Sequence, residues 1–352
     1  MLKEIIIEGY KSIKDMDLQL GPINIFIGSN GVGKTNFMSF FRLFNQVYEQ
    51  RLQNYTMQNR ADSLLHYGLK HSNEIRGCFH YDFGSYSAAL QPRDNGSMFL
   101  SEEHFVCGDK TESVKNRDES VLRDSMSAEI EPLKSYMQNF RIYHFHDTGK
   151  GSPLRTDSDV NDNRFLRCDG GNLGSVLYDF QLHYPKALKR IEMTIRSVMP
   201  YFERFDLHPS SYDEKINMVW IDRNAPDKYF SVNDLSDGSV RFIALSALLM
   251  QPLLPKMIFI DEPELGLHPA AIGKLSGMIK SAASRGCQIV ISTQSVSLVN
   301  HFDVDDLITV DRHDGHSVFN RLDPKSLETW LDDYSLGELW TKSVINGQPV
   351  NL

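Results

Sequence analysis

One run of eight residues constrains this chain more than any other feature. Residues 28–35 read Gly-Ser-Asn-Gly-Val-Gly-Lys-Thr and fit the pattern G-x-x-x-x-G-K-[ST] without deviation. In this pattern the glycines let backbone N–H groups wrap a phosphate, the lysine reaches the β- and γ-phosphates, and the hydroxyl ligates Mg²⁺. An apolar run precedes the loop and a helical pattern follows it, as a phosphate site requires. We therefore predict a nucleotide-binding P-loop, with Asn30, Gly31, Gly33, Lys34, Thr35 and Asn36 at the nucleotide and Thr35 at the metal.

A second motif lies far along the chain. Residues 257–262 read Met-Ile-Phe-Ile-Asp-Glu, an apolar strand pattern that ends in two carboxylates. Ligands of α/β sheets bind at the carboxyl ends of the strands. We expect Asp261 to hold Mg²⁺, directly or through water, and Glu262 to polarise an attacking water. Carboxylates end many surface strands, so this pattern becomes specific only in combination with the P-loop.

A third motif, residues 235–239, reads Leu-Ser-Asp-Gly-Ser and opens an apolar helix pattern. A serine with flexible neighbours at a helix N-terminus forms an anion site from its hydroxyl, the unpaired N–H groups and the helix dipole. The alternative is an ordinary serine N-cap. The spacing of 25 residues between Ser236 and Asp261 (261 − 236) favours the anion site, so Ser236 and Gly238 are candidate nucleotide-binding residues.

Together these three motifs resemble those of the ABC-type ATPases of the SMC, RecF and OLD group, and most closely the single-chain AAA-family ATPases of bacterial anti-phage defence loci. The resemblance covers residues 1–50 and about 141–345. It implies an α/β fold, an ABC-type P-loop ATPase head with a mixed sheet, helices on its faces and an antiparallel N-terminal sheet. The expected parts are the P-loop half of the core (1–50), an inserted lid-like subdomain (51–140), and a C-terminal half (141–352) with signature helix, Walker B strand, D-loop and switch.

The resemblance also implies further site residues. Lys11, within Tyr-Lys-Ser, matches an element that borders the nucleotide, and residues 264–269 match the D-loop, which crosses a dimer interface. Residues 143–147 stand where the Q-loop is expected but contain no glutamine, so His146 and Asp147 are both candidates. Gln294 occupies the switch position, where it can donate a hydrogen bond to the γ-phosphate but cannot take a proton. We therefore expect slow ATP hydrolysis, with Glu262, Lys34 and Gln294 as the catalytic residues.

In such ATPases the signature serine completes the nucleotide site of a second subunit. One P-loop and one signature per chain thus imply a head-to-tail homodimer around two ATP molecules. Our first hypothesis is a module that engages or senses double-stranded DNA, in anti-phage defence or DNA repair. The candidate DNA contacts on one helical pattern are Lys186, Lys189, Arg190 and Arg196, although a solvated helix face is the simpler interpretation.

Two other functions remain as alternatives. The chain shows no nuclease constellation, so it could instead be a nucleotide-gated scaffold that holds and regulates a separately encoded nuclease or toxin. A transporter subunit is disfavoured, because 202 residues separate Lys34 from Ser236 (236 − 34), and no membrane-partner motif is recognised.

Composition narrows the class further. The 37 Lys and Arg residues face 46 Asp and Glu residues, a net charge of −9 that argues against a basic nucleic-acid coat. Four cysteines without a C-x-x-C pair exclude a disulfide scaffold or a zinc knuckle. We find neither a membrane-length apolar run nor a signal-peptide pattern, and expect a cytoplasmic protein without a membrane partner. Residues 101–131 carry nine acids against four bases, which predicts a solvated, partly mobile excursion.

Overall fold

The computed structural model describes residues 1–347, and the chain divides into two compact units. Unit 1 comprises residues 1–142, 256–259 and the chain from 288 onward, and unit 2 comprises residues 143–255 and 260–287. The last five residues of the predicted C-terminal half lie outside the described residues.

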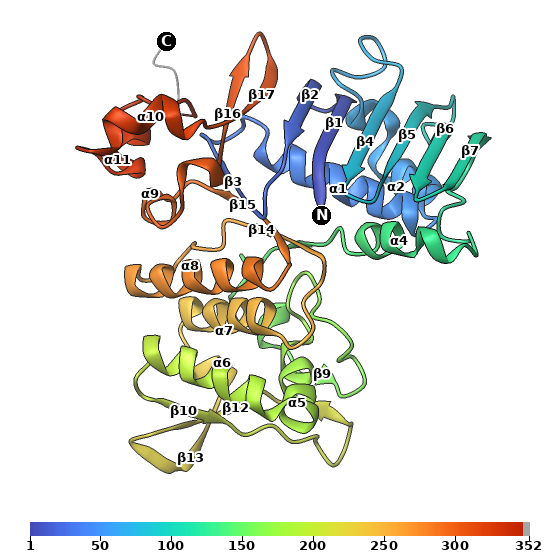
Figure 1. The fold of residues 1–352 in the computed structure, drawn as a ribbon. Coiled ribbons are helices and arrows are strands. Elements are labelled where there is room, and N and C mark those ends of the chain that lie inside the picture. Colours follow the sequence, from blue (N-terminus) through green and yellow to red (C-terminus); the bar gives the residue numbers. More distant parts are fainter. Residues whose placement is uncertain (348–352) are drawn as a thin grey trace. The chain divides into compact units, whose positions relative to one another are not determined.

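Unit 1 begins with a six-stranded antiparallel sheet in the order β2-β1-β4-β5-β6-β7 (Figure 1). Its alternating apolar side chains, such as Ile5 and Ile7, are fully buried against helices on one face. The strands are β1 (Leu2–Tyr10), β2 (Ile13–Gln19), β4 (Ile75–Tyr81), β5 (Gly84–Pro92), β6 (Met98–Cys107) and β7 (Lys110–Arg117). The helices beside it are α1 (Lys34–Tyr48), α2 (Leu52–Asn59), α3 (Ala61–Leu64), η1 (Ala128–Ile130) and α4 (Glu131–Met137).

The expectation of a solvated, partly mobile excursion over residues 101–131 missed two strands, although most side chains of the second one are exposed. Strands β6 and β7 extend the sheet that β1 and β2 begin. The charges of this run alternate between the two faces: Glu102 pairs with Lys115 across the strands at 2.6 Å, whereas Glu103 points inward. Charged side chains on an edge strand keep it soluble and discourage further pairing, so a charge run here is compatible with a strand. That this part of the chain acts as a lid stays a prediction.

The second sheet has the order β17-β16-β3-β15-β14-β8. Strand β3 (Ile23–Ile27) is buried along its whole length and pairs in parallel with β15 (Gln288–Thr293) and β16 (Leu307–His313). Strand β17 (His316–Arg321) pairs antiparallel with β16, and β14 (Met257–Asp261) and β8 (Ile142–Tyr143) complete the sheet. The remaining elements of unit 1 are α9 (Val296–Val299), η4 (Val304–Asp306), α10 (Pro324–Leu331) and α11 (Leu336–Thr341). A mixed sheet beside an antiparallel N-terminal sheet is the predicted architecture.

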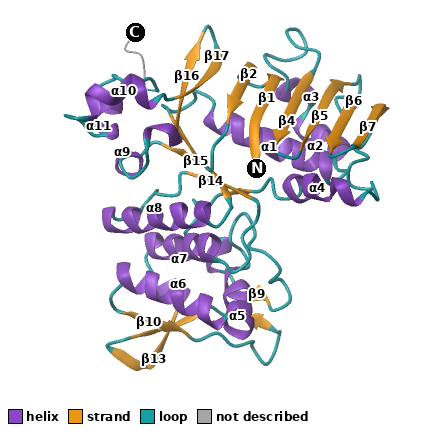
Figure 2. Cartoon of the chain, in the orientation of Figure 1, coloured by secondary structure: helices purple, strands orange, loops and turns teal. Residues whose placement is uncertain are grey.

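Unit 2 packs helices against a small antiparallel sheet (Figure 2). Its helices are α5 (Leu173–His183), α6 (Pro185–Val198), α7 (Asp237–Met250) and α8 (Pro269–Ser284), with the short turns η2 (Pro153–Arg155) and η3 (Val232–Asp234). Its strands are β10 (Phe202–Phe205), β12 (Val219–Asp222) and β13 (Ala225–Ser231), and the pair β9 (Ser158–Asp159) and β11 (Lys215–Ile216). Helix α7 is apolar nearly all round because it is buried between α6 and α8.

Two further findings concern the apolar character of the helices and the state of the cysteines. In residues 1–347, no helix combines the length and the apolar character that crossing a membrane demands. All four cysteines carry free thiols.

Candidate functional site

The loop between β3 and α1 has one closed side and one open side. Gly33 adopts a φ of 119°, and a Cβ atom there would lie 2.0 Å from the hydroxyl oxygen of Ser317 and 2.9 Å from that of Ser12. Gly31 has a φ of 78°, and a Cβ there would meet nothing within 4 Å. Only glycine combines such φ values with this close approach. The loop is therefore fixed against Ser12 and Ser317 and presents its backbone to open space at Gly31.

The residues after this loop fit a bound triphosphate. Lys34 is buried and its ammonium donates to the carbonyl oxygens of Gly28 (2.6 Å) and Ser29 (2.9 Å), which hold the charge at the loop. The next residue, Thr35, is exposed. Helix α1 has no acid in its first turn, so no carboxylate opposes the positive end of its dipole. Backbone donors, an ammonium and a hydroxyl are the groups that a phosphate chain with Mg²⁺ needs.

The switch position lies beside the P-loop within unit 1. Strands β3 and β15 pair in parallel with Ile27 opposite Thr293, so the residues that follow both strands emerge at one sheet edge. The amide nitrogen of Gln294 donates to the side-chain oxygen of Asn30 at 2.8 Å. Two predicted site residues that are 264 positions apart in the sequence are thus in direct contact.

Two other predicted residues of unit 1 contact the first helix or its surroundings. The ammonium of Lys11 donates to the hydroxyl of Ser39 on α1 at 3.0 Å, and burial, followed by the nearby charge of Arg42, lowers its pKa. Asn36 donates to the hydroxyl of Ser12 at 2.7 Å, the same hydroxyl that faces Gly33. The predicted contacts of Lys11 and Asn36 with the nucleotide stay predictions.

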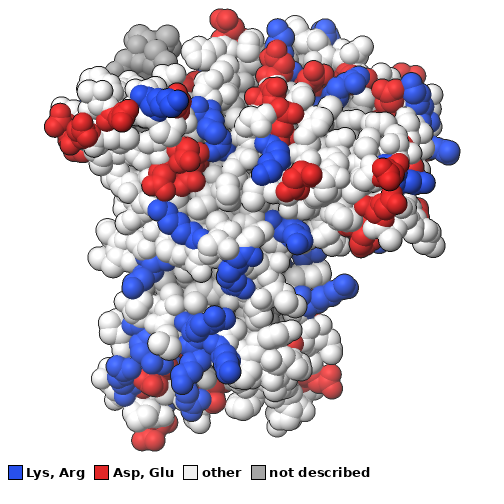
Figure 3. Space-filling model, in the orientation of Figure 1, with Lys and Arg blue, Asp and Glu red and all other residues white. Residues whose placement is uncertain are grey.

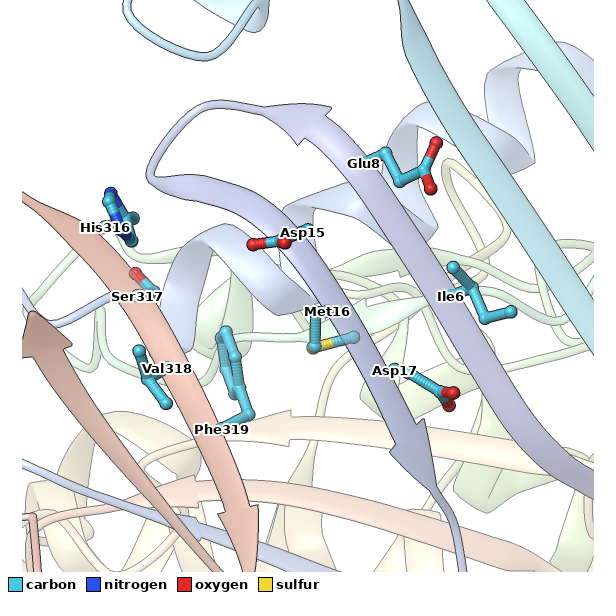
Figure 4. Close-up of a pocket in the computed structure, with 9 residues that line it drawn as sticks. All are labelled: Ile6, Glu8, Asp15, Met16, Asp17, His316, Ser317, Val318 and Phe319. Carbon is cyan, nitrogen blue, oxygen red and sulfur yellow. The ribbon is translucent and has the colours of Figure 1, made fainter.

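A hollow of about 400 Å³ in unit 1 is a poor candidate for a phosphate ligand. It is lined from β1, β2 and β17 by Ile6, Glu8, Asp15, Met16, Asp17, His316, Ser317, Val318 and Phe319 (Figure 4). Its three carboxylates would repel phosphate oxygens. We therefore place the expected nucleotide at the P-loop and not in this hollow.

In unit 2 the strand end at Asp261 is surrounded by two histidines. His144 lies with its Nδ1 atom 3.5 Å from a carboxylate oxygen of Asp261, and His146 contacts the carbonyl oxygen of Asp261 through its Nε2 atom at 2.9 Å. A carbonyl only accepts, so His146 donates through Nε2. Asp147 instead accepts from the backbone N–H of Gly149 at 3.2 Å. Of the two Q-loop candidates, the contact with Asp261 favours His146.

Glu262 stands in a strained backbone conformation. Its φ is 42°, in the left-handed region that side chains other than glycine rarely adopt. Such strain concentrates at functional sites, where the surrounding structure maintains it. This observation agrees with a special role for Glu262 without assigning one.

The signature segment, residues 235–239, tests whether Ser236 is a helix N-cap, an anion-binding residue or both. Ser236 is the N-cap of α7 and accepts from the backbone N–H of Ser239 at 3.2 Å, so the N-cap interpretation is correct. Ser236 is also exposed, which leaves the anion-site prediction open. A Cβ atom at Gly238 would lie 2.5 Å from the carbonyl oxygen of Gly266 in the segment 264–269. The signature helix therefore packs directly on the predicted D-loop of its own chain.

Two buried arginines that the sequence analysis did not single out organise this region. Arg155 donates to the carbonyls of Val232 (2.6 Å) and Leu235 (3.0 Å) and to the carboxylate of Asp237 (2.8 Å). Its guanidinium therefore ties the segment before α7 to the first residue of that helix. Arg155 is one of two arginines in the polar loop 149–164, and nothing in the sequence distinguishes it from Arg164.

Arg241 is the second of these arginines and is 4% exposed. It donates to the carbonyls of Phe145 (2.7 Å), His146 (3.0 Å) and Leu265. One side chain thus joins α7 to the predicted Q-loop and D-loop segments. A single charge inside the apolar helix pattern 239–250 is the signal that could have identified it, because a buried charge must have partners.

No preformed metal site accompanies these residues. Within residues 1–347, no three His, Cys, Asp or Glu side chains are grouped so that they could hold a metal ion. Mg²⁺ usually takes one or two protein ligands and completes its shell with water and substrate phosphates. The predicted ligands Thr35 and Asp261 fit that pattern.

The chain matches two family models. Residues 109–300 match the model described as "AAA domain, putative AbiEii toxin, Type IV TA system", and residues 1–157 match that described as "AAA ATPase domain". Among curated proteins, the OLD nuclease of Thermus scotoductus is 22% identical over 363 aligned residues, which span 89% of this chain and 63% of that protein. The Old nuclease of Escherichia phage P2 is 46% identical over 44 residues, 12% of this chain and 8% of that protein. The chain therefore matches less than two thirds of the length of either relative.

Solved structures with the same fold include SMC heads. A crystal structure of an SMC head bound to the C-terminal winged-helix domain of ScpA superposes with a TM-score of 0.63 at 14% identity, over 93% of this chain and 99% of that one. An SMC head with an extended coiled coil, bound to a ScpA domain from Pyrococcus furiosus, gives a TM-score of 0.60 at 13% identity, over 94% and 98% of the two chains. At these identities the likeness shows the fold alone.

Proposed function

The chain belongs to the AAA-domain ATPase family whose model covers residues 109–300, and we propose that it hydrolyses ATP within a head-to-tail homodimer. Its ABC-type fold is that of an SMC head, as the motifs predicted. The observation that supports ATP binding most directly is the P-loop: a backbone that only glycine fits at Gly33, the ammonium of Lys34 at the loop carbonyls, and an exposed Thr35.

Each catalytic residue has a role that its chemistry supports. Lys34 neutralises charge on the β- and γ-phosphates, and Thr35 and Asp261 would hold Mg²⁺, which would offset further phosphate charge. Glu262 orients and deprotonates the attacking water. Gln294 donates a hydrogen bond to the γ-phosphate from a position fixed by Asn30. Because an amide cannot take a proton, this arrangement is suited to slow turnover.

The second half of each site comes from the partner subunit. Ser236 is exposed at the N-terminus of a 14-residue helix, where hydroxyl and backbone donors can receive the γ-phosphate of a partner's ATP. Gly238 allows that backbone to approach closely. ATP binds the closed dimer more tightly than the open subunits, so ATP drives closure and hydrolysis releases it.

Light scattering of Glu262→Gln with and without Mg-ATP tests this function. The amide keeps the shape of Glu262 but cannot act as a base, so the variant binds ATP and retains the dimer. We expect the solution mass to double with Mg-ATP, and the ATPase rate to fall by about 100-fold or more.

Two further variants identify the interface. In the Glu262→Gln background, Ser236→Arg places a bulky cation at the signature and is expected to keep the mass monomeric. Ser284→Arg makes the same change at an exposed serine at the end of α8 and should leave the dimer intact. If ATP binds but neither the mass nor its response to Ser236→Arg changes, the signature assignment is wrong.

For the closed dimer we propose a DNA-engaging or DNA-sensing role. The family description "putative AbiEii toxin, Type IV TA system" and the names of the OLD nuclease relatives keep the scaffold for a separate nuclease or toxin as the second candidate. Duplex DNA that changes the ATPase rate supports the first role, whereas an unchanged rate and unchanged dimerisation support the second.

A further inference from the structure

Helix α6 in unit 2 has an outer face of one charge sign. The helix carries the basic residues Lys186, Lys189, Arg190 and Arg196, and its one acid is Glu192. Glu192 is turned toward β10, where its carboxylate accepts from the backbone N–H of Phe205 at 2.9 Å. Burial raises the pKa of this carboxyl. No carboxylate of α6 therefore opposes the cations on the outer face.

Three of these cations are available to a ligand. Lys186, Lys189 and Arg190 are exposed, and none of them forms an ion pair with another side chain of residues 1–347. Arg196 differs, because its guanidinium donates to the carbonyl of Glu203 on β10. The three exposed cations fall within about one turn of the helix, spanning about 6 Å along its axis.

Beside these three cations, two arginines share one carboxylate. Arg223 lies on the same side of β10 as Arg196, since both contact Glu203, at 2.9 Å and 3.9 Å. Figure 3 shows Lys and Arg side chains gathered where Figure 1 draws α6 and β10. A helix face that is merely solvated normally mixes both signs, in pairs four residues apart. Lys186, Lys189 and Arg190 have no such partner among residues 1–347, and three unpaired cations on one helical turn of a chain with a net charge of −9 need another explanation.

We propose that Lys186, Lys189 and Arg190 form a contact surface for the phosphate backbone of duplex DNA. A duplex carries one negative charge per about 1.7 Å of its axis, so three cations on one helical turn reach several phosphates together. The N-terminal turn of α6 has no acid, and its dipole adds to the attraction. These contacts depend on the charge and the spacing of the phosphates, so binding is independent of base sequence. This inference rests on the proposed function, for which it supplies the DNA-binding face.

Fluorescence anisotropy with a labelled duplex of about 25 base pairs tests the surface. The test variant carries Lys186→Gln, Lys189→Gln and Arg190→Gln. The control carries Lys3→Gln, Lys70→Gln and Lys325→Gln, which removes the same charge at exposed lysines of unit 1. Both are measured between 50 and 200 mM salt, without nucleotide and, in the Glu262→Gln background, with Mg-ATP.

Loss of three phosphate contacts reduces the magnitude of the slope of log K against log salt by about 2.7. Between 50 and 200 mM salt, the affinity of the test variant should therefore fall about 40-fold less than that of the parent protein. We expect this loss in the test variant and a change of less than about twofold in the control. Circular dichroism checks that both variants are folded. Arg190→Gln alone, which leaves the helix otherwise intact, should lower the slope by about 0.9.

Several outcomes would contradict the proposed DNA-contact surface. The test variant could keep the parental slope, or the control could lose as much as the test variant, which would show a net-charge effect only. Stronger binding of single-stranded DNA, of RNA or of anionic vesicles than of the duplex would overturn the choice of ligand. The proposed function fails separately. Its dimerisation assay contains no DNA and is independent of the three cations, so closure with Mg-ATP together with duplex binding that survives all three substitutions rejects this surface alone.

Discussion

The P-loop in unit 1 and the signature segment in unit 2 are both glycine-containing turns that precede a helix, yet they are held in different ways. The P-loop is held by its own backbone and by short side chains: Lys34 bonds to carbonyls five and six residues before it, and the hydroxyl of Ser317 donates to the carbonyl of Val32. The signature segment is held by side chains from elsewhere, since Arg155 reaches it from 80 residues away and Arg241 connects it to the D-loop.

This difference separates a rigid element from an adjustable one. A loop whose conformation depends on its glycines should keep that conformation unless a glycine is replaced. A segment held by a few long side chains can shift when one of those side chains is removed. The comparison predicts that substitutions in unit 2 spread along the arginine contacts, while those in unit 1 remain local.

The largest effect is expected for Arg241→Gln. It leaves the carbonyls of Phe145, His146 and Leu265 without their shared donor, at a cost of about 3 kcal/mol of stability. Hydrogen exchange should accelerate in residues 143–147 and 264–269 and remain unchanged in residues 28–35. Arg285→Gln is the matched control, because this exposed arginine also donates to two carbonyls and should cost less than about 1 kcal/mol. Equal costs for the two variants would contradict the role of Arg241.

The next effect concerns Gly33→Ala, measured as affinity for a fluorescent ATP analogue. The new Cβ collides with Ser317 at a φ that side chains avoid, and the displaced loop should bind nucleotide about 30- to 100-fold more weakly. Gly96→Ala is the control, since Gly96 has a φ of 83° with nothing within 4 Å of its added Cβ. It should cost about 1 kcal/mol of stability and leave nucleotide affinity intact. Tight nucleotide binding by Gly33→Ala would refute the dependence of the loop on this glycine.

A smaller effect distinguishes the two Q-loop candidates. His146→Ala removes the donor to the carbonyl of Asp261 and should lower kcat for ATP about tenfold with little change in KM. Asp147→Asn should have a weaker effect, because Asp147 only accepts from Gly149. The reverse order of the two kcat values would assign the Q-loop role to Asp147.

The smallest effect contrasts two adjacent glutamates of unit 1. Glu103 accepts from Tyr86 (2.8 Å) and from the backbone of Val121 (3.0 Å), and burial raises its pKa above the usual 4.5. The folded protein then keeps a proton that the unfolded chain releases, so stability falls as pH rises from 4.5 through the raised pKa. Glu102, bonded to Lys115, has a lowered pKa, so its contribution disappears as pH falls below 4.5 through the lowered pKa.

Urea unfolding across pH 3–8 measures both slopes. Glu103→Gln should remove the loss of stability above pH 4.5, and Glu102→Gln should remove only the loss below it. Slopes of the same sign for the two residues would show that Glu103 is not held as a buried acid.

The sequence by itself determined the residues and patterns that act locally. The P-loop, the strand ending at Asp261, the helix beginning after Ser236 and the family were all recognisable, because each depends on contiguous residues whose spacing reflects a backbone geometry. The strands of residues 101–117 were missed since their charges suggested solvent, and only pairing with β5 shows that alternate positions face a core.

Tertiary structure alone decided which distant residues meet. The contact between Asn30 and Gln294, the histidines at Asp261 and the buried Arg155 and Arg241 all join segments that no local pattern connects. The physical reason is that a buried guanidinium or a histidine is satisfied by carbonyl and carboxylate groups wherever the fold brings them. Its partners are therefore set by packing, whereas the glycines of a P-loop are set by the backbone angles of the loop itself.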